Sequence, residues 1–389
     1  MKNQFYSSKN SVYFLFINGP HHVHHLIVPA LTFASIQNKY KTIIVSGCPN
    51  NTSIINKVHK SYKNAKFKLI EVAVPLRYKF KWYKKDKLYP PPYHAFGKIV
   101  SLLRDASAIV TTSHLIPNLI KKHRIKNSLL FYLYHGMGTR AYGFEESQGE
   151  FDYLFIPGKY YKDRLTSKGI CKKEQLALVG HPKFDWLNNK TSKNNKKLFN
   201  NNNPIFYYNP HWELEISSFI KWRNIILDFF KKNIQYNLIF APHPLIKHNA
   251  YNKNYSINHN LEDAENIIID FESEKLLDET YIKNADVYIG DVSSMAVYWV
   301  IKRPRPCIFI NAHRINWAND ESYIIWNYGM VIEKPKYLAE TVLKSLNNKD
   351  YELKQKNLKD SFIYSNKTKS SSMLCAEFLI EKLVHNREE

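Results

Sequence analysis

Three histidines each follow a short apolar run of the kind that forms a buried strand. They are His135 in SLLFYLYHG, His211 in PIFYYNPHW and His243 in NLIFAPHPL. An imidazole accepts a proton from an attacking hydroxyl near neutral pH, and when charged it hydrogen-bonds to a phosphate oxygen. A lone histidine at a strand end is more often structural than catalytic. Three of them in equivalent positions favour one shared site for proton transfer or phosphate binding.

The stretch Asn284–Asn311 is also suited to binding an anion. Its pattern predicts a short buried strand, a turn at Gly290 and Asp291, a helix that opens on Ser293 and Ser294, and a second strand. The first N–H groups of such a helix have no intrahelical partner, and the helix dipole adds positive potential, so the turn predicts a phosphate site. The two serines are also typical helix caps. Because the charge of Asp291 would repel a phosphate, we expect its side chain to contact the turn or a neighbouring histidine rather than the ligand.

The segment GMGTRAYG after His135 carries further candidates. Its glycines, Gly136 among them, allow a ligand to approach the backbone closely, and Arg140 can pair with a phosphate through two parallel hydrogen bonds. His243 lies between two prolines, which fix the direction of its side chain. The chain lacks a Walker loop, a G-x-G-x-x-G after the first strand, H-E-x-x-H and G-x-S-x-G, so nucleotide hydrolysis and hydride transfer are poor interpretations.

Four histidines in HHVHH (His21, His22, His24 and His25) lie where the first predicted strand gives way to a helix. A metal site would need further ligands, but no cysteine or carboxylate lies close by in the sequence. We therefore expect no metal and no cofactor. Because the first turn of a Rossmann-like domain usually faces the ligand cleft, we expect His22 and His25 to contact the acceptor molecule.

Basic and aromatic residues are interleaved in the segment Arg77–Tyr93. Lysine and arginine attract anionic lipid headgroups, and aromatic rings settle at the boundary between water and hydrocarbon. We expect this segment to bind an anionic membrane surface; stacking on single-stranded nucleic acid and a solvated loop with packed aromatics are the alternatives. The residues assigned to the membrane and acceptor side are Arg77, Lys79, Lys81, Trp82, Lys84 and Lys85.

Length and composition limit the class of protein. With 389 residues the chain is long enough for two domains, and 44% hydrophobic residues indicate globular folding. The formal charge of +22 predicts an anionic partner, although lysine- and asparagine-rich runs also arise from base composition alone. Four scattered cysteines give no disulfide or zinc pattern. No apolar run is long enough to cross a bilayer and none resembles a signal peptide, so we expect a cytoplasmic protein, peripheral on the inner face of the membrane.

Two series of strands and helices must position these residues. Apolar strands separated by helices predict a parallel sheet covered on both faces. The first series places strands in Val12–Gly19, Lys41–Gly47, Lys66–Val74, Ala106–Ser113, Ser128–Gly136, Phe151–Gly158 and Gln175–Leu187. The second, after a polar linker at Asn188–Asn203, places them in Pro204–Trp212, Asn237–Leu245, Asn266–Asp270 and the stretch Asn284–Asn311.

This order predicts an α/β protein with two Rossmann-like domains facing a cleft. The expected domains are residues 1–187 and 204–389, joined by the linker at 188–203. Leu338–Leu346 and Ser371–Val384 are expected to form the closing helices, and the last of them can pack back on the first domain. In such sheets a ligand binds at the carboxyl ends of the strands.

Five motifs, taken in order, resemble the CDP-glycerol glycerophosphotransferase family, whose members build teichoic acids and capsules. The motifs are His135-Gly136, Gly180-His181-Pro182-Lys183-Phe184-Asp185, Tyr208-Asn209-Pro210-His211-Trp212, Pro242-His243-Pro244 and Asp291-Val292-Ser293-Ser294. Five residues in three of these regions depart from the family pattern. The family's Thr-Pro after His-Gly is Met137-Gly138 here, its Thr and Arg in Tyr-Ala-Pro-Thr-Trp-Arg are His211 and Glu213, and an Asp usual after Ser-Ser is Tyr298.

The resemblance implies a glycosyltransferase B type fold. It also implies a transferase that moves glycerol or ribitol phosphate from a CDP-activated donor to a hydroxyl of a lipid-linked or polymer acceptor, with release of CMP. His135 is then expected near the attacking hydroxyl, and His243 is the second catalytic candidate. The residues expected around the donor are Ser293, Ser294, His211, Gly136, Thr139, Arg140, Lys183 and, through the turn, Asp291.

Two other functions stay open at this point. A sugar-nucleotide-dependent glycosyltransferase or epimerase has the same architecture, because a fold does not fix its chemistry. A basic nucleic-acid-binding protein without enzymatic activity would explain the charge but not the histidines at strand ends. The main interpretation expects no nucleic acid as a partner.

Overall fold

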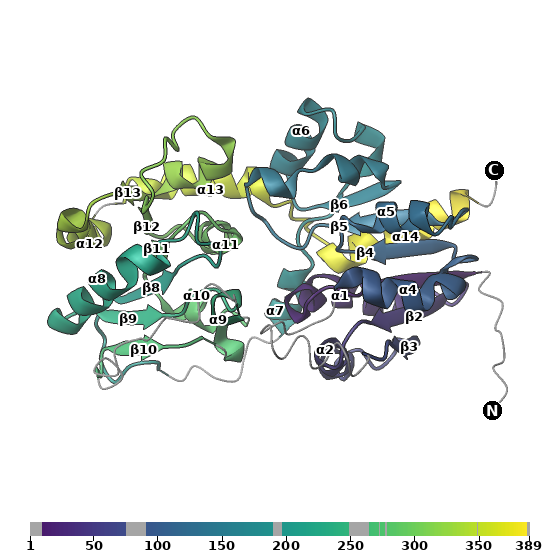
Figure 1. Ribbon diagram of the computed structural model, residues 1–389, viewed down its shortest axis with the longest axis horizontal. Coiled ribbons are helices and arrows are strands. Elements are labelled where there is room, and N and C mark those ends of the chain that lie inside the picture. The colour runs from purple at the N-terminus through teal and green to yellow at the C-terminus, as the bar shows by residue number, and fades with distance from the viewer. Residues whose placement is uncertain are drawn as a thin grey trace. The chain divides into compact units, whose positions relative to one another are not determined.

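A computed structural model of the chain describes residues 10–74, 91–189, 197–248, 264–271, 273–276, 278–347 and 349–386. The chain divides into two compact units, each built on a parallel sheet (Figure 1). The first unit comprises Met1–His135, Phe144–Thr191 and Ser361–Glu389, and the second comprises Gly136–Gly143 and Ser192–Asp360. The basic and aromatic residues expected to bind a membrane, Arg77 to Lys85, lie outside the described residues.

The first unit is organised around a seven-stranded sheet in the order β3-β2-β1-β4-β5-β6-β7. Every neighbouring pair is parallel, and β1 lies between β2 and β4, with Val12 opposite Thr42 on one side and Ala108 on the other. β1 is buried along its whole length, as its unbroken apolar sequence predicts. The strands are β1 (Ser11–Phe16), β2 (Lys41–Ser46), β3 (Lys68–Glu71), β4 (Ala108–Thr111), β5 (Leu129–Leu133), β6 (Tyr153–Ile156) and β7 (Leu176–Leu178).

Helices complete the layers of this unit. α1 is apolar on nearly every side and is therefore almost entirely buried against the sheet and α14. The 3-10 turn η1 (Pro20–His22) leads from β1 into α1. The helices are α1 (Val23–Ile36), α2 (Pro49–His59), α4 (Pro92–Leu103), α5 (Ile116–Lys122), α6 (Lys159–Ser167), α7 (Lys183–Asn189) and α14 (Ser371–His385).

The last segment of the chain is an integral part of the first unit. Figure 1 shows α14, in yellow, among the purple and blue elements of the N-terminal part. The Tyr40 hydroxyl donates to the Leu383 carbonyl over 2.9 Å, and the Ser372 N–H donates to an Asp185 carboxylate oxygen over 2.7 Å. Cys375 and Leu379 of α14 are buried in the same apolar core as α1.

The second unit contains a six-stranded parallel sheet in the order β10-β9-β8-β11-β12-β13. Its core gathers apolar side chains of the strands with those of α8 and α12. The strands are β8 (Ile205–Asn209), β9 (Asn237–Phe240), β10 (Ile267–Ile269), β11 (Val287–Gly290), β12 (Cys307–Ile310) and β13 (Met330–Ile332). The helices are α8 (Phe219–Lys232), α9 (Leu245–His248), α10 (Thr280–Asn284), α11 (Ser294–Lys302), α12 (Leu338–Asn347) and α13 (Tyr351–Phe362).

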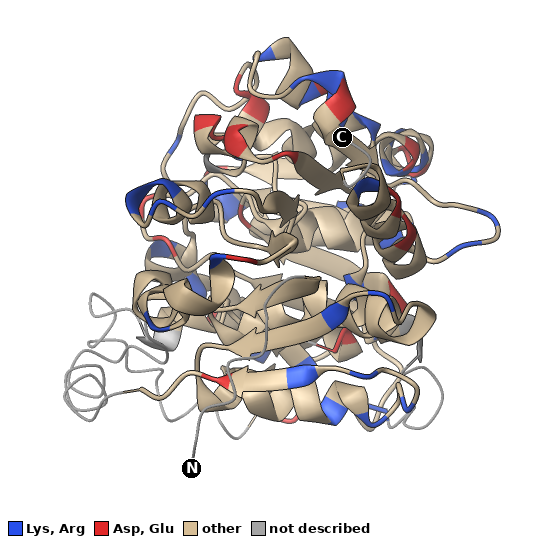
Figure 2. Cartoon of the chain, turned by 90° about the vertical axis from the view of Figure 1, so that its right-hand side faces the viewer, with Lys and Arg blue, Asp and Glu red and all other residues tan. Residues whose placement is uncertain are grey.

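The structure confirms the predicted fold class of two Rossmann-like parallel sheets with helices. Each segment predicted to contain a strand does so, but the strands are shorter; in Gln175–Leu187 only Leu176–Leu178 is a strand, and α7 begins at Lys183. β13 and α13 had no counterpart in the prediction. In the described residues no helix combines the length and apolar character that crossing a membrane requires. Figure 2 shows the lysines and arginines spread over several helices and loops and interspersed with acidic residues, rather than gathered in one block.

Gly180 offers a test of how tightly the C-terminal segment is joined to the first unit. Its φ is +83°, and a Cβ atom there would lie 2.5 Å from the Tyr364 carbonyl oxygen and 2.6 Å from Ser371 Oγ. We expect Gly180→Ala to lose about 1–2 kcal/mol of unfolding free energy through its left-handed backbone. We expect it to lose about 1–3 kcal/mol more through steric overlap. Urea denaturation of the full chain measures both losses.

Gly169 is the matched control for this substitution. Its φ is +67°, but a Cβ atom there would meet nothing within 4 Å. Gly169→Ala should therefore lose only the backbone contribution. Equal losses in the two variants would contradict a tight contact between Gly180 and the C-terminal segment.

Candidate functional site

The candidate residues follow the strands at the centre of each sheet. In both sheets the strand order reverses there, at β1 and β4 in the first unit and at β8 and β11 in the second. The two strands are parallel, but the connections that follow them lead to opposite sides of the sheet. A crevice for a ligand forms between their carboxyl ends. His22 and Thr112 follow β1 and β4, whereas His211 and Asp291 follow β8 and β11.

The turn from β11 to α11 is built as the sequence predicted. A Cβ atom at Gly290 would lie 2.9 Å from the Asn209 carbonyl oxygen, so glycine is required where β11 passes the end of β8. Ser293 is the N-cap, with an extended backbone, and its Oγ accepts from the Ala296 N–H over 3.2 Å. Ser294 is the first residue of the helix. Ser293 thus has a capping role, while anion binding by Ser294 and the first N–H groups of α11 stays a prediction.

Asp291 holds this turn in place. Its carboxyl group is completely buried and accepts three hydrogen bonds: one from the His211 N–H over 2.8 Å, and one at each oxygen from the Ser218 N–H over 3.0 Å. Burial raises the pKa of Asp291 to about 7, while the hydrogen bonds act in the opposite direction. Although we grouped Asp291 with the donor residues, its oxygens accept from the backbone between β8 and α8, as expected for a structural role.

His211 and His243 lie together in the second unit, with ring centroids 6.0 Å apart. Nδ1 of His211 accepts from the Glu213 N–H over 3.0 Å, and Nδ1 of His243 accepts from the Leu245 N–H over 3.2 Å. Burial lowers the pKa of both imidazoles, that of His243 to about 4. A neutral imidazole whose Nδ1 accepts must carry its proton on Nε2, so each ring offers one N–H donor.

The segment Gly136–Gly143 belongs to the second unit although its neighbours in sequence belong to the first. The Thr139 hydroxyl donates to the Ser322 carbonyl over 2.6 Å. The Arg140 guanidinium forms an ion pair with Glu213, with 2.6 Å between Nη2 and Oε2. Arg140 was expected to pair with a phosphate, but here it contacts the acidic residue that replaces the family's arginine. Gly136 lies near the start of α11, because a Cβ atom there would be 3.9 Å from the Ser294 Cβ.

His135 lies in a group of imidazoles in the first unit. Its ring centroid is 4.1 Å from that of His22 and 6.4 Å from that of His25, which is 5.1 Å from His181. Burial and neighbouring imidazoles lower the pKa of His22, His25 and His135, so all three rings are neutral near pH 7. Lys183, the first residue of α7, adds a positive charge near His25.

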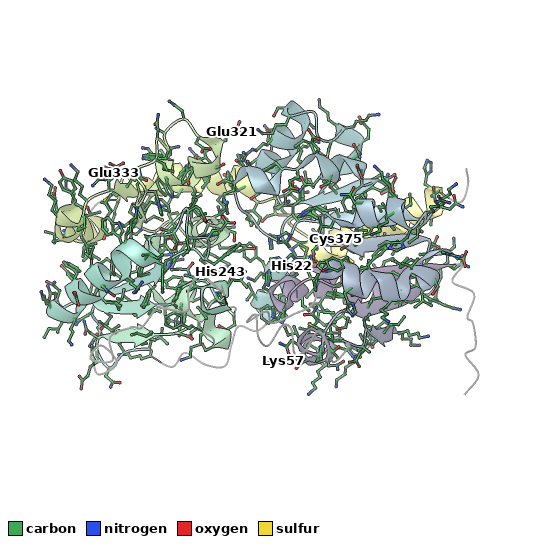
Figure 3. All side chains as sticks on the ribbon, in the orientation of Figure 1. His22, Lys57, His243, Glu321, Glu333 and Cys375 are labelled. Carbon is green, nitrogen blue, oxygen red and sulfur yellow. The ribbon has the colours of Figure 1, made fainter. Side chains whose placement is uncertain are left out.

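The structure thus places the predicted residues in two groups. Figure 3 labels one member of each: His22, at the start of α1 in the first unit, and His243, just after β9 in the second. Despite the many imidazoles, no cluster of three or more potential ligands suited to a metal ion occurs in the described part of the chain. The first group is His22, His25, His135 and Lys183; the second is His211, His243, Ser293, Ser294, Asp291, Gly136, Thr139 and Arg140.

Three contacts of these groups were not predicted. Thr112 and Asn18 hydrogen-bond to His22, and Glu213 pairs with Arg140. The polar run TTS at 111–113, directly after an apolar strand, was a signal that could have identified Thr112, because strand ends in a parallel sheet share one edge. Glu213 stood out only as a departure from the family motif.

Asp291→Asn should destabilise the second unit. The substituted amide keeps the shape of the carboxylate but loses its charge, and one of its ends becomes a donor that faces backbone N–H groups. We expect a loss of about 2–3 kcal/mol of unfolding free energy, measured by urea denaturation at pH 8. Asp152→Asn is the control, because Asp152 is exposed but also accepts from a backbone N–H distant in sequence, that of Leu130. A loss no greater than that of the control would contradict the structural role of Asp291.

Comparison with known proteins agrees with this architecture. Residues 78–379 match the family described as CDP-glycerol:poly(glycerophosphate) glycerophosphotransferase. A search of curated proteins gives no significant match. Among solved structures, the UDP-GlcNAc 2-epimerase from Neisseria meningitidis bound to UDP-GlcNAc aligns with a TM-score of 0.60 and 11% identity, over 96% of this chain and 100% of that chain.

Two further solved structures have the same fold. A histidine-to-alanine variant of the wall teichoic acid polymerase TagF aligns with a TM-score of 0.60 and 16% identity, over 98% of this chain and 90% of that chain. The UDP-GlcNAc 2-epimerase from Methanocaldococcus jannaschii aligns with a TM-score of 0.56 and 14% identity, over 96% and 99%. At these identities the likeness concerns the fold alone, whereas the family match spans most of the chain. The chain therefore belongs to the CDP-glycerol:poly(glycerophosphate) glycerophosphotransferase family.

Proposed function

We propose that the protein transfers a polyol phosphate, glycerol or ribitol phosphate, from a CDP-activated donor to a hydroxyl group of a lipid-linked or polymer acceptor, and releases CMP. The observation that carries this proposal is the pair of neutral imidazoles, His211 and His243, in the unit that also contains the N-terminus of α11. A diphosphate needs several N–H donors, and these elements supply them without a carboxylate directed at the ligand.

The donor diphosphate would bind to four kinds of group in the second unit. These are the first N–H groups of α11, the Ser294 hydroxyl, the Nε2–H groups of His211 and His243, and the Arg140 guanidinium. Neutral N–H donors and a helix N-terminus stabilise the charge that develops on phosphoryl oxygens, and they need little reorganisation because the fold already fixes them.

His135 would act as the base toward the acceptor. Its imidazole takes the proton from the acceptor hydroxyl while that oxygen forms a bond to the distal phosphorus of the donor. The bond between this phosphorus and the bridging oxygen breaks, and CMP leaves as a phosphate anion that requires no proton. One proton is therefore left on His135 in each cycle, and it passes to solvent before the next.

The acceptor is proposed to lie at an anionic membrane surface on the cytoplasmic side. The support is the basic and aromatic composition of Arg77–Tyr93 together with the family's use of polymer acceptors. A second candidate function is chemistry on a UDP-sugar, which the fold similarity to UDP-GlcNAc 2-epimerases favours. The first function uses a CDP-activated donor and the second a UDP-sugar, so a screen of donors separates them.

Purified protein should release CMP from CDP-glycerol or CDP-ribitol in the presence of a polyol-phosphate acceptor. We expect His135→Ala to lower kcat by about 10²–10⁴-fold, because a base contributes that much. We expect His243→Ala to lower kcat/KM by about 10²–10³-fold, because it removes a donor to the phosphates. Circular dichroism confirms folding, and His385→Ala, in an exposed residue of α14, is the control. Full activity in both active-site variants would disprove the assignment, and turnover of UDP-sugars alone would favour the second function.

The fall of kcat/KM on the acid side of the pH profile should lie at lower pH than it would for an ordinary histidine. Burial and the nearby His21 and His114 lower the pKa of His135 from 6.5 to about 3, while the backbone of Thr112 acts against this shift. The base is active only when neutral, so the titration of His135 should not lower kcat/KM, which reports the free enzyme, as the pH falls from 8 through 6.5; a loss caused by Asp291, whose pKa is about 7, would be shared by His135→Ala. A bound anionic donor favours imidazolium, so the acid limb of kcat should lie at higher pH than that of kcat/KM. An acid limb of kcat/KM near 6.5 that His135→Ala lacks would contradict a neutral, desolvated His135.

A further inference from the structure

His135 is hydrogen-bonded to the backbone of Thr112, but within the described residues no carboxylate orients its ring. Its Nδ1 is buried, and within the described residues that nitrogen makes no hydrogen bond. In most nucleophile–base pairs a carboxylate or a carbonyl at the distal nitrogen sets the direction of the imidazole. A displacement of about 1 Å in a catalytic group can cost 10²-fold in rate, so contacts beyond this one backbone hydrogen bond should help to hold the ring.

The neighbouring ring of His22 is held firmly. Its Nδ1 lies 3.1 Å from the Thr112 hydroxyl oxygen and 3.3 Å from the Asn18 side-chain nitrogen. Asn18 is itself fixed, because its carbonyl accepts from the Asn51 amide over 2.9 Å. Both groups donate to Nδ1, so the proton of His22 is on Nε2 and its ring has one orientation.

The two rings are in direct contact. Their centroids are 4.1 Å apart and their planes are inclined by 34°, so the face of His22 covers His135. Thr112 reaches both residues: its hydroxyl contacts His22, and its backbone favours the protonated form of His135. Thr112 is nearly fully buried directly after β4, the central strand next to β1. Its position is therefore set by the sheet.

We propose that Thr112 and His22 are positioning residues for His135: the Thr112 hydroxyl fixes the tautomer and orientation of His22, whose ring then holds His135 in place. This inference rests on the proposed role of His135 as the base. It differs from the expectation that His22 contacts the acceptor, because the two hydrogen bonds to His22 and its contact with His135 direct the residue inward.

Kinetics of Thr112 variants test the first link. Thr112→Val keeps the shape of the side chain and removes the hydroxyl; we expect kcat to fall about 10–100-fold with the KM for the CDP donor within twofold. Thr112→Ser restores the hydroxyl and should return kcat to within about threefold of the wild type. Thr111→Val is the matched control, since this neighbour is also buried and its hydroxyl accepts from the Ser113 N–H instead. Wild-type kcat in Thr112→Val would overturn the proposal.

Variants of His22 test the second link. His22→Phe keeps a ring against His135 but no nitrogen, whereas His22→Ala removes both. If the ring contact positions the base, His22→Phe retains at least tenfold more kcat than His22→Ala, and the KM for the acceptor changes in neither. Equal kcat in the two variants, or a changed acceptor KM with unchanged kcat, would show that His22 contacts the acceptor instead.

A spectroscopic measurement separates this inference from the proposed function. In the full chain with ¹⁵N-labelled histidine, long-range ¹H–¹⁵N spectra report the tautomer of each ring, assigned by single His→Gln variants. We expect His22 as the Nε2–H tautomer, and Thr112→Val should shift the resonances of both His22 and His135, while Thr111→Val shifts neither. If this coupling is seen but no CDP donor is turned over, the proposed function fails and the arrangement stands. If His135 is unaffected in a folded Thr112→Val protein, the positioning role is wrong whatever the activity.

Discussion

The buried carboxylate of Asp291 is the interaction on which the second unit's site depends. It joins the ends of two strands that are adjacent in the sheet but distant in sequence, because it follows β11 and accepts from the backbone of His211, after β8, and of Ser218, before α8. A carboxylate without such partners would cost several kcal/mol to bury. These bonds therefore fix the distance between the imidazole donors and the N-terminus of α11.

Both units place their candidate residues at the ends of central strands, but they hold them there with different kinds of group. Each uses the carboxyl ends of the two central strands, where the strand order reverses. In the second unit a buried carboxylate, that of Asp291, holds the backbone at the end of β8. In the first, Asn18 and Thr112 hydrogen-bond to His22, whose neutral ring lies against His135. An uncharged environment leaves an imidazole in the form that accepts a proton.

The local features of this protein could be predicted from its sequence, and the non-local ones could not. The cap at Ser293 depends on residues within a few positions of each other, and apolar runs between helical segments are enough to predict parallel sheets. The partners of Asp291 lie 73 and 80 residues away, and Arg140 finds Glu213 only after folding. The sequence did not distinguish β13 or α13 from the loops beside them. β13 has only three residues, and α13 is strongly polar.

The return of α14 to the first unit determines when that unit can be completed during synthesis. Translation proceeds from the N-terminus, and domains often fold as they emerge. Here the apolar side of α1 stays exposed until α14 leaves the ribosome, after every strand of the second unit has been made. The second unit can therefore close first, although it is encoded later. A nascent chain stalled before Ser371 would present an uncovered apolar helix surface, the kind that chaperones bind.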